Sequence, residues 1–78
     1  MADQVATAAD YLAGYLRAHP KAEDSLAGIM QWWLQRDAPL FSADDVQQAL
    51  MRLQDRGVAQ SRMRNRETVW SAADRAPG

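Results

Sequence analysis

Apolar residues recur every three or four positions in three stretches of the chain, a spacing typical of helices that pack on a core. In the first stretch, from about Asp3 to Ala18, one apolar stripe is formed by Val5, Ala9, Leu12 and Leu16. Ala and Leu are strong helix formers, and His19-Pro20 ends the pattern because the residue before proline avoids helical backbone angles. The spacing therefore predicts a first helix over this stretch.

The second stretch predicts a helix from near Asp24 to near Gln35. Asp24 or Ser25 can cap the free N–H groups of its first turn. Its apolar face is formed by Leu26, Ile29, Met30 and Trp33. The polar segment 36–39 then interrupts the pattern. Leu40-Phe41 is expected to fill the core from this connection, as a loop or a short strand.

The third stretch carries the clearest helix signals. Ser42 is a good N-cap, and Asp45 three residues later resembles the reciprocal capping box. The buried stripe is predicted to be Val46, Ala49, Leu50 and Leu53. Gly57 is expected to end the helix in a left-handed conformation.

Beyond Gly57 the polar and apolar residues alternate, which predicts two short strands over residues 58–62 and 68–72. Arg64-Asn65-Arg66 lies between them, and Asn65 can adopt the positive φ that a hairpin turn needs. We expect one domain over residues 1–73 and a flexible tail over 74–78.

The run from Ser42 to Val58, followed by Arg62 to Trp70, resembles the recognition helix and wing of the winged helix-turn-helix family. The resemblance extends from about Val5 to Ala72. It implies a mainly helical fold, three helices with a small β-hairpin, and a binding function. The connection from Gln35 to Phe41 is longer than the roughly three or four residues of a helix-turn-helix turn.

The composition argues against catalysis and against bound metal. The chain has no cysteine and a single histidine, His19, so neither a disulfide nor a zinc site with several Cys or His ligands is expected. Asp44 and Asp45 are adjacent, and adjacent helix positions point about 100° apart, so capping suits them better than acid–base chemistry. We expect no enzyme activity, no cofactor and no small-molecule substrate.

The residues at the start carry no basic segment and precede no long apolar run, so neither a secretory signal nor a membrane span is expected. A cytoplasmic location follows as the default. Residues 1–56 hold eight acidic and five basic residues, a balance of −3, whereas residues 57–78 hold two acidic and four basic residues, a balance of +2. The positive charge is therefore concentrated in the predicted hairpin.

Two adjacent tryptophans, Trp32 and Trp33, stand out in the second helix. Trp33 falls on the apolar stripe and is expected in the core, while Trp32 is turned about 100° from it. One interpretation is that Leu40-Phe41 folds over Trp32. The other is that Trp32 is an anchor for a protein partner, since exposed tryptophan is enriched at interface hot spots.

Tyr11 and Tyr15 lie one turn apart beside the stripe of the first helix, where they can seal the core edge or extend a docking surface. The first functional hypothesis, slightly favoured, is a protein-docking module that uses Trp32, Tyr11, Tyr15 and Met51. It requires at least one partly exposed aromatic residue on the folded domain.

The second hypothesis is a regulator that binds double-stranded DNA. Gln and Arg can read base edges from a recognition helix, and Arg in a wing can contact phosphates or the minor groove. The candidates are Gln47, Gln48, Arg52, Arg62, Arg64 and Arg66. The wing can equally be an ordinary solvated hairpin, and Asp44 and Asp45 would repel phosphates at the helix start. The oligomeric state stays open.

Overall fold

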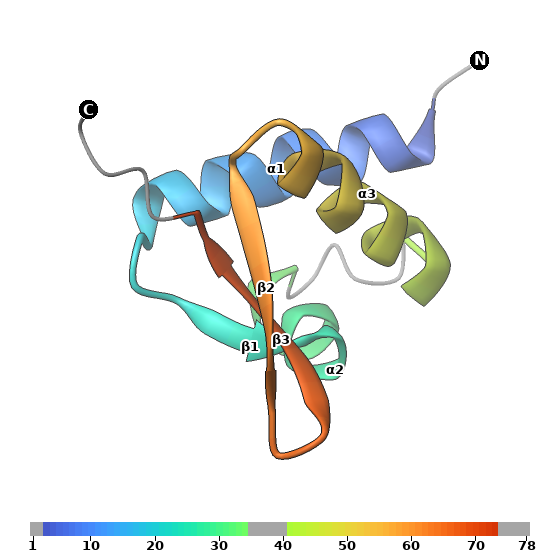
Figure 1. The fold of residues 1–78 in the computed structure, drawn as a ribbon. Coiled ribbons are helices and arrows are strands. Elements are labelled where there is room, and N and C mark those ends of the chain that lie inside the picture. Colours follow the sequence, from blue (N-terminus) through green and yellow to red (C-terminus); the bar gives the residue numbers. More distant parts are fainter. Residues whose placement is uncertain (1–2, 35–40, 74–78) are drawn as a thin grey trace.

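The computed structural model describes residues 3–34 and 41–73 of the chain. They form three helical segments, the second of which changes from α to π type along its length, and a three-stranded antiparallel sheet. In chain order the elements are α1 (Gln4–Ala18), β1 (Glu23–Ser25), α2 (Leu26–Gly28), the π-helix η1 (Ile29–Trp33), α3 (Ala43–Asp55), β2 (Ala59–Arg64) and β3 (Glu67–Ala72). In Figure 1, α1 and α3 lie side by side at one end, and the β2–β3 hairpin projects away from them.

The predicted ends of α1 and α3 are confirmed. Asp3 caps α1 by accepting a hydrogen bond from the backbone N–H of Val5 at 3.0 Å. Ser42 and Asp45 form the reciprocal capping box of α3, with bonds of 3.0 and 3.2 Å. Gly57 has a φ of 75°, as expected for the left-handed residue that follows a helix.

The predicted second helix is correct only in part. Glu23–Ser25 is a strand rather than the start of a helix, and Ser25 caps α2 through a 3.2 Å bond from the N–H of Gly28. From Ile29 the helix is of the π type, closed by the N–H of Leu34 donating to the carbonyl of Ile29. The predicted end at Gln35 lies outside the described residues.

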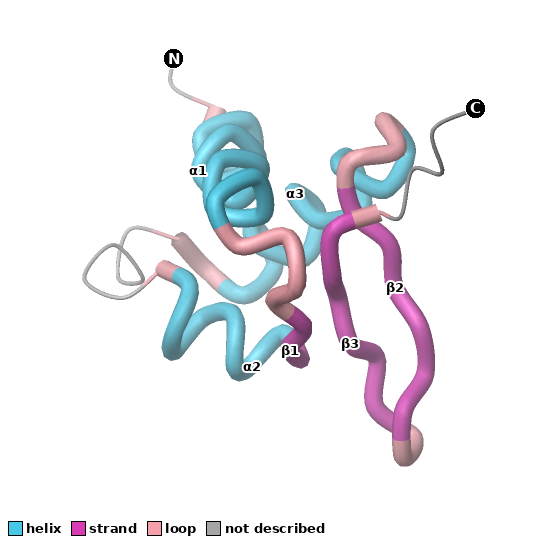
Figure 2. Tube along the Cα trace, turned by 90° about the vertical axis from the view of Figure 1, so that its left-hand side faces the viewer, coloured by secondary structure: helices cyan, strands magenta, loops and turns pink. Residues whose placement is uncertain are grey.

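The sheet has the order β1-β3-β2, so the hairpin strand β3 is central. Asp24 pairs with Trp70, and Ser61 pairs with Trp70 from the other side. The hairpin closes through Asn65 and Arg66, whose φ values of 52° and 67° fit a two-residue turn. Both predicted hairpin strands are present, but β2 extends to Arg64, which was predicted to lie between the strands, and β1 was not predicted. Figure 2 shows β3 between its two neighbours.

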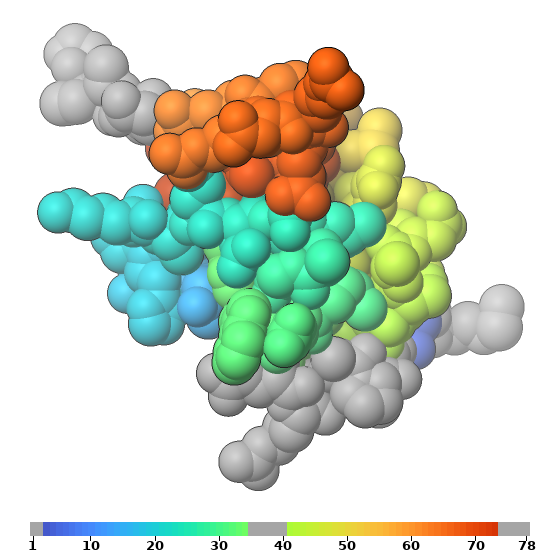
Figure 3. Space-filling view, turned by 90° about the horizontal axis from the view of Figure 1, so that it is seen from below, coloured from blue at the N-terminus to red at the C-terminus, as the bar shows by residue number. Residues whose placement is uncertain are grey.

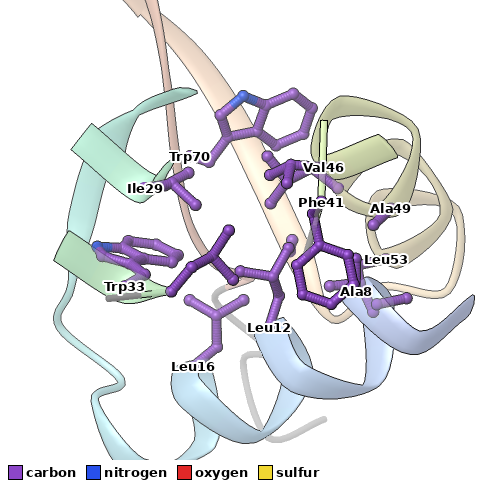
Figure 4. Close-up of a cluster of buried hydrophobic side chains, with 14 of the residues drawn as sticks. Ala8, Leu12, Leu16, Ile29, Trp33, Phe41, Val46, Ala49, Leu53 and Trp70 are labelled. Carbon is purple, nitrogen blue, oxygen red and sulfur yellow. The ribbon is translucent and has the colours of Figure 1, made fainter. Parts of the chain in front are cut away.

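The core lies where α1, η1, α3 and the inner side of the sheet meet (Figure 4). The predicted core is confirmed, because its members belong to one buried cluster: Leu12, Leu16, Ile29, Trp33, Val46, Leu50 and Leu53. Phe41 joins this cluster from the connection, as expected, while Leu40 lies outside the described residues. Within the described part, none of the helices has the length and apolar character needed to cross a membrane.

Candidate functional site

Trp32 is the most exposed aromatic side chain among the described residues, at 60%. Its neighbours Trp33 and Leu34 are buried, at 3% and 0%. The expectation that Leu40-Phe41 covers Trp32 is therefore wrong, since Phe41 instead packs in the core. An indole left in water is an uncommon feature on the surface of so small a domain.

The π-helix explains this contrast between neighbours. A π turn contains more residues than an α turn, so each side chain is rotated from the previous one by less than about 100°. Ile29, Trp33 and Leu34 are thereby brought onto one buried face. Trp32 is turned further from that face than an α-helix would turn it. Single π turns occur frequently at functional sites.

Tyr15 supports the segment that carries Trp32. Its ring stacks on Trp33 at a centroid distance of 4.8 Å and lies 4.4 Å from the ring of His19. Tyr15 is half-buried and packs against the core, so it seals the core edge. Tyr11, one turn earlier, is 37% exposed. The two tyrosines thus lie on the side of α1 that faces η1.

Met51 is separated from this aromatic group. It is 51% exposed and lies on α3, on the face opposite the buried stripe that contains Leu50 and Val46. Because η1 packs on the core, Met51 faces away from it. The candidate docking surface therefore centres on Trp32. Tyr15 is connected to it only through its stack on Trp33, and Tyr11 lies one turn earlier on α1. Figure 3 shows η1 in green on the face that also carries the orange hairpin.

The candidate base-reading side chains of α3 interact with carboxylates of the chain itself. The Gln48 amide donates to Asp44 at 2.7 Å, and the Arg52 guanidinium pairs with Asp3 at 3.3 Å. Gln47 is exposed on the same helix. A groove-reading helix needs these groups to be available to bases, so the arrangement does not favour direct readout.

Among the titratable groups of residues 3–34 and 41–73, Asp3 has the clearest change in pKa. Its pKa is lowered, first by a hydrogen bond from the backbone N–H of Ala6 and next by its hydrogen bond with Arg52. A carboxylate at a helix N-terminus is stabilised in its charged form by the free N–H groups of the first turn. The negative charge beside Arg52 is therefore kept at neutral pH.

Two of the hairpin arginines share one carboxylate. Glu23 accepts from Arg62 at 3.0 Å through one oxygen and from Arg64 at 2.7 Å through the other. Arg66 lies in the turn and has no carboxylate partner within residues 3–34 and 41–73. Arg62 and Arg64 thus lie on one strand face, and Arg66 occupies the tip.

Sequence reasoning missed Glu23, because nothing in its local pattern indicates a strand. It contacts the hairpin only because β1 pairs with β3, which places it next to arginines some forty residues away. A shallow pocket of about 290 Å³ lies beside it, lined by residues 20–23, by Gln60 and Arg62, and by Ser71 and Ala72.

Within the described part of the chain, no group of three or more His, Cys, Asp or Glu residues is placed to hold a metal ion. No family model, curated protein or solved structure matches the chain. The candidate site therefore has to be interpreted from its own geometry.

Proposed function

We propose that the chain is a non-catalytic winged-helix module that docks another protein through Trp32. The fold assignment is supported by the order of three helical segments, Gly57 and a two-stranded hairpin, with β1 fastening the hairpin to the helices. The lack of cysteine supports a cytoplasmic location as part of the same proposal. Fold alone does not determine function, so the proposal depends on the surface.

The observation that carries the proposal is the exposure of Trp32 beside the buried Trp33. Covering an exposed indole with a partner removes a large apolar area from water, which stabilises a complex by about 25 cal/mol per Å² of that area before association costs. Next to Trp32, the stacked rings of Trp33 and Tyr15 hold the backbone of η1 against the core. A rigid, exposed tryptophan is the kind of residue that dominates protein interfaces.

Charge favours a protein partner over a DNA duplex. Residues 1–56 carry a balance of −3, and Asp44 and Asp45 occupy the first turn of α3. Phosphate contacts supply most of the affinity of DNA-binding proteins, and these carboxylates oppose them. Glu23 further neutralises part of the positive charge of the hairpin.

The experiment compares proteins captured by the full chain and by Trp32→Ala under otherwise equal conditions. Trp32→Ala is expected not to capture a specific protein that the parent chain captures. When that captured protein is purified and added to the parent chain, the tryptophan emission of the parent chain should shift to shorter wavelength. Met51→Ala is the matched control, because Met51 is 51% exposed but lies on α3, away from η1. Retention of every captured protein by Trp32→Ala would contradict the proposal.

DNA binding is the second candidate, and the position of the hairpin favours it. The hairpin projects from the body (Figure 1) with Arg66 in its turn, a position from which a minor groove can be reached. A polarisation titration against mixed duplexes distinguishes the candidates. Under the docking proposal, binding is weak, independent of sequence and lost at physiological salt. Nanomolar binding to one defined duplex would establish the DNA alternative instead.

A further inference from the structure

The β2 strand has an open edge next to the two arginines that Glu23 holds together. Among the described strands, β2 pairs only with β3, and Figure 2 shows no described element beyond it. The side chains of β2 become exposed from Arg62 to Arg64. We propose that this edge, a surface separate from Trp32, binds an extended acidic segment of a partner protein as an additional strand.

The hydrogen-bonding groups at the open edge follow from the register. The carbonyl of Val58 accepts from the N–H of Ala73 at 3.0 Å, so Val58 points its backbone groups toward β3. In an antiparallel pair these groups alternate along the strand. Ser61 and Met63 therefore direct their N–H and C=O groups to the open edge, where an extended chain can pair with them.

The same alternation determines which side chains an added strand would meet. Arg62 and Arg64 lie on the outer face of the sheet, opposite the face on which Trp70 enters the core. On an added antiparallel strand, the residues opposite them would be two positions apart and on that same outer face. Met63, at 66% exposure, lies on the other face between them. The surface is therefore complementary to a segment with an acidic, an apolar and an acidic residue in succession.

Glu23 prepares the arginines for such a ligand. Each guanidinium uses one nitrogen on a Glu23 oxygen, and five N–H donors are available on every arginine. Both arginine side chains remain about two-thirds exposed. The triad has a net positive charge, and Lys21 at the adjacent pocket adds another. Carboxylates of a partner can thus accept from the outward-facing donors while Glu23 keeps the two groups side by side.

Charge also distinguishes this partner from other occupants. A second copy paired through its own β2 would place arginines against arginines, and like charges facing each other across strands are destabilising. A DNA duplex offers no backbone amides for strand pairing. An acidic extended peptide matches both the charge and the open edge.

The test uses a seven-residue peptide with blocked termini, glutamate at alternating positions and valine between them. Fluorescence anisotropy of the labelled peptide measures its affinity. Hydrogen–deuterium exchange followed by ¹⁵N NMR shows which amides of the chain the peptide protects. The glutamate peptide should bind with protection of the Ser61 and Met63 amides, and a peptide with lysine in place of glutamate should not bind. Arg62→Gln with Arg64→Gln should weaken binding about tenfold, as expected for the loss of two exposed charge contacts. Arg17→Gln, which removes one positive charge from α1, should leave it unchanged.

A glutamate peptide N-methylated on the amides that face β2 keeps its charge but cannot pair with the strand, and it should not bind the unmodified chain. Because this experiment uses the unmodified chain, its result does not depend on whether a variant folds. Equal binding of the N-methylated or the lysine peptide would overturn the proposal, and so would a dimer formed through β2 or tighter binding of duplex DNA at this edge. Trp32→Ala should bind the peptide normally, which separates this proposal from the docking function.

Discussion

The rings of Tyr15 and Trp33 stack at a centroid distance of 4.8 Å with an interplanar angle of 14°. This contact joins the C-terminal half of α1 to the π-helix and covers one face of Trp33, which is 3% exposed. Trp32, the preceding residue in the chain, is 60% exposed and has no such role in the core. The two tryptophans therefore make separable contributions, one to stability and the other to binding.

Trp33→Ala should lower the free energy of unfolding by about 3–5 kcal/mol, because it removes a buried indole and leaves a cavity. Trp32→Ala should change it by no more than about 0.5 kcal/mol, as is usual for an exposed position. Urea denaturation followed by circular dichroism measures both. Equal losses for the two variants would contradict the separation of roles.

Leu50 lies at the centre of the core and is fully buried. Leu50→Ala should cost about 2–5 kcal/mol, a large part of the total stability of a domain of this size. Thermal unfolding measures the effect, and Met51→Ala at the exposed neighbouring position is the control. An unchanged Tm for Leu50→Ala would refute the position of α3 against α1.

Gly14 is an opportunity to stabilise the protein. It lies inside α1, and a Cβ built there meets nothing within 4 Å. Gly14→Ala should raise the free energy of unfolding by about 0.5–1 kcal/mol, because alanine restricts the unfolded chain and favours the helix. Gly28→Ala is the contrasting variant: a Cβ there would overlap the Asp24 carboxylate, so the gain should be absent. A loss of stability in Gly14→Ala would show that this face of α1 needs glycine.

Elements with strong local signals could be predicted from the sequence. The capping box of Ser42 and Asp45 predicted where α3 begins, and Gly57 predicted where it ends. Both signals act within one turn of the chain. The hairpin turn at Asn65 was predicted for the same reason. Arg66 also has a positive φ there, which its residue type does not indicate.

Features that depend on distant contacts could not be predicted. Glu23–Ser25 has no alternating pattern, and it is a strand only because β3 offers a partner. The π-helix likewise arises because Ile29, Trp33 and Leu34, the residue that follows η1, must all reach one core. The periodicity of an α-helix gave the right stripe for Ile29 and Trp33 and omitted Leu34. Local propensity does not predict the π turn, so the sequence could not decide whether Trp32 is exposed.

Glu23 limits the positive charge that the hairpin presents. Glu23→Gln should strengthen the weak binding of duplex DNA at low salt and steepen its dependence on salt, because Arg62 and Arg64 become available to phosphates. Polarisation titrations at several salt concentrations measure this. Asp10→Asn makes the same change of net charge on α1, and identical behaviour of the two variants would show that only net charge matters.

The N-cap of α1 should make stability depend on pH in the acid range. The folded state lowers the pKa of Asp3 below its ordinary value of 3.8, so the charged carboxylate stabilises the fold at pH values above that value. The contribution is lost as the pH falls through the lowered folded-state pKa. Asn caps helices about as well as Asp, so Asp3→Asn removes the charge and the ion pair with Arg52 while leaving a capping group.

At neutral pH, Asp3→Asn should therefore be less stable than the parent, and the difference should shrink to zero as the pH falls through the lowered folded-state pKa of Asp3. Urea denaturation of both proteins at a series of pH values measures the difference, and Asp10→Asn on the same helix controls for the loss of one acidic residue. Added salt should reduce the neutral-pH difference, since the contact between Asp3 and Arg52 is exposed. A difference that persists unchanged at low pH would mean that the shape of the side chain, and not its charge, supports the start of α1.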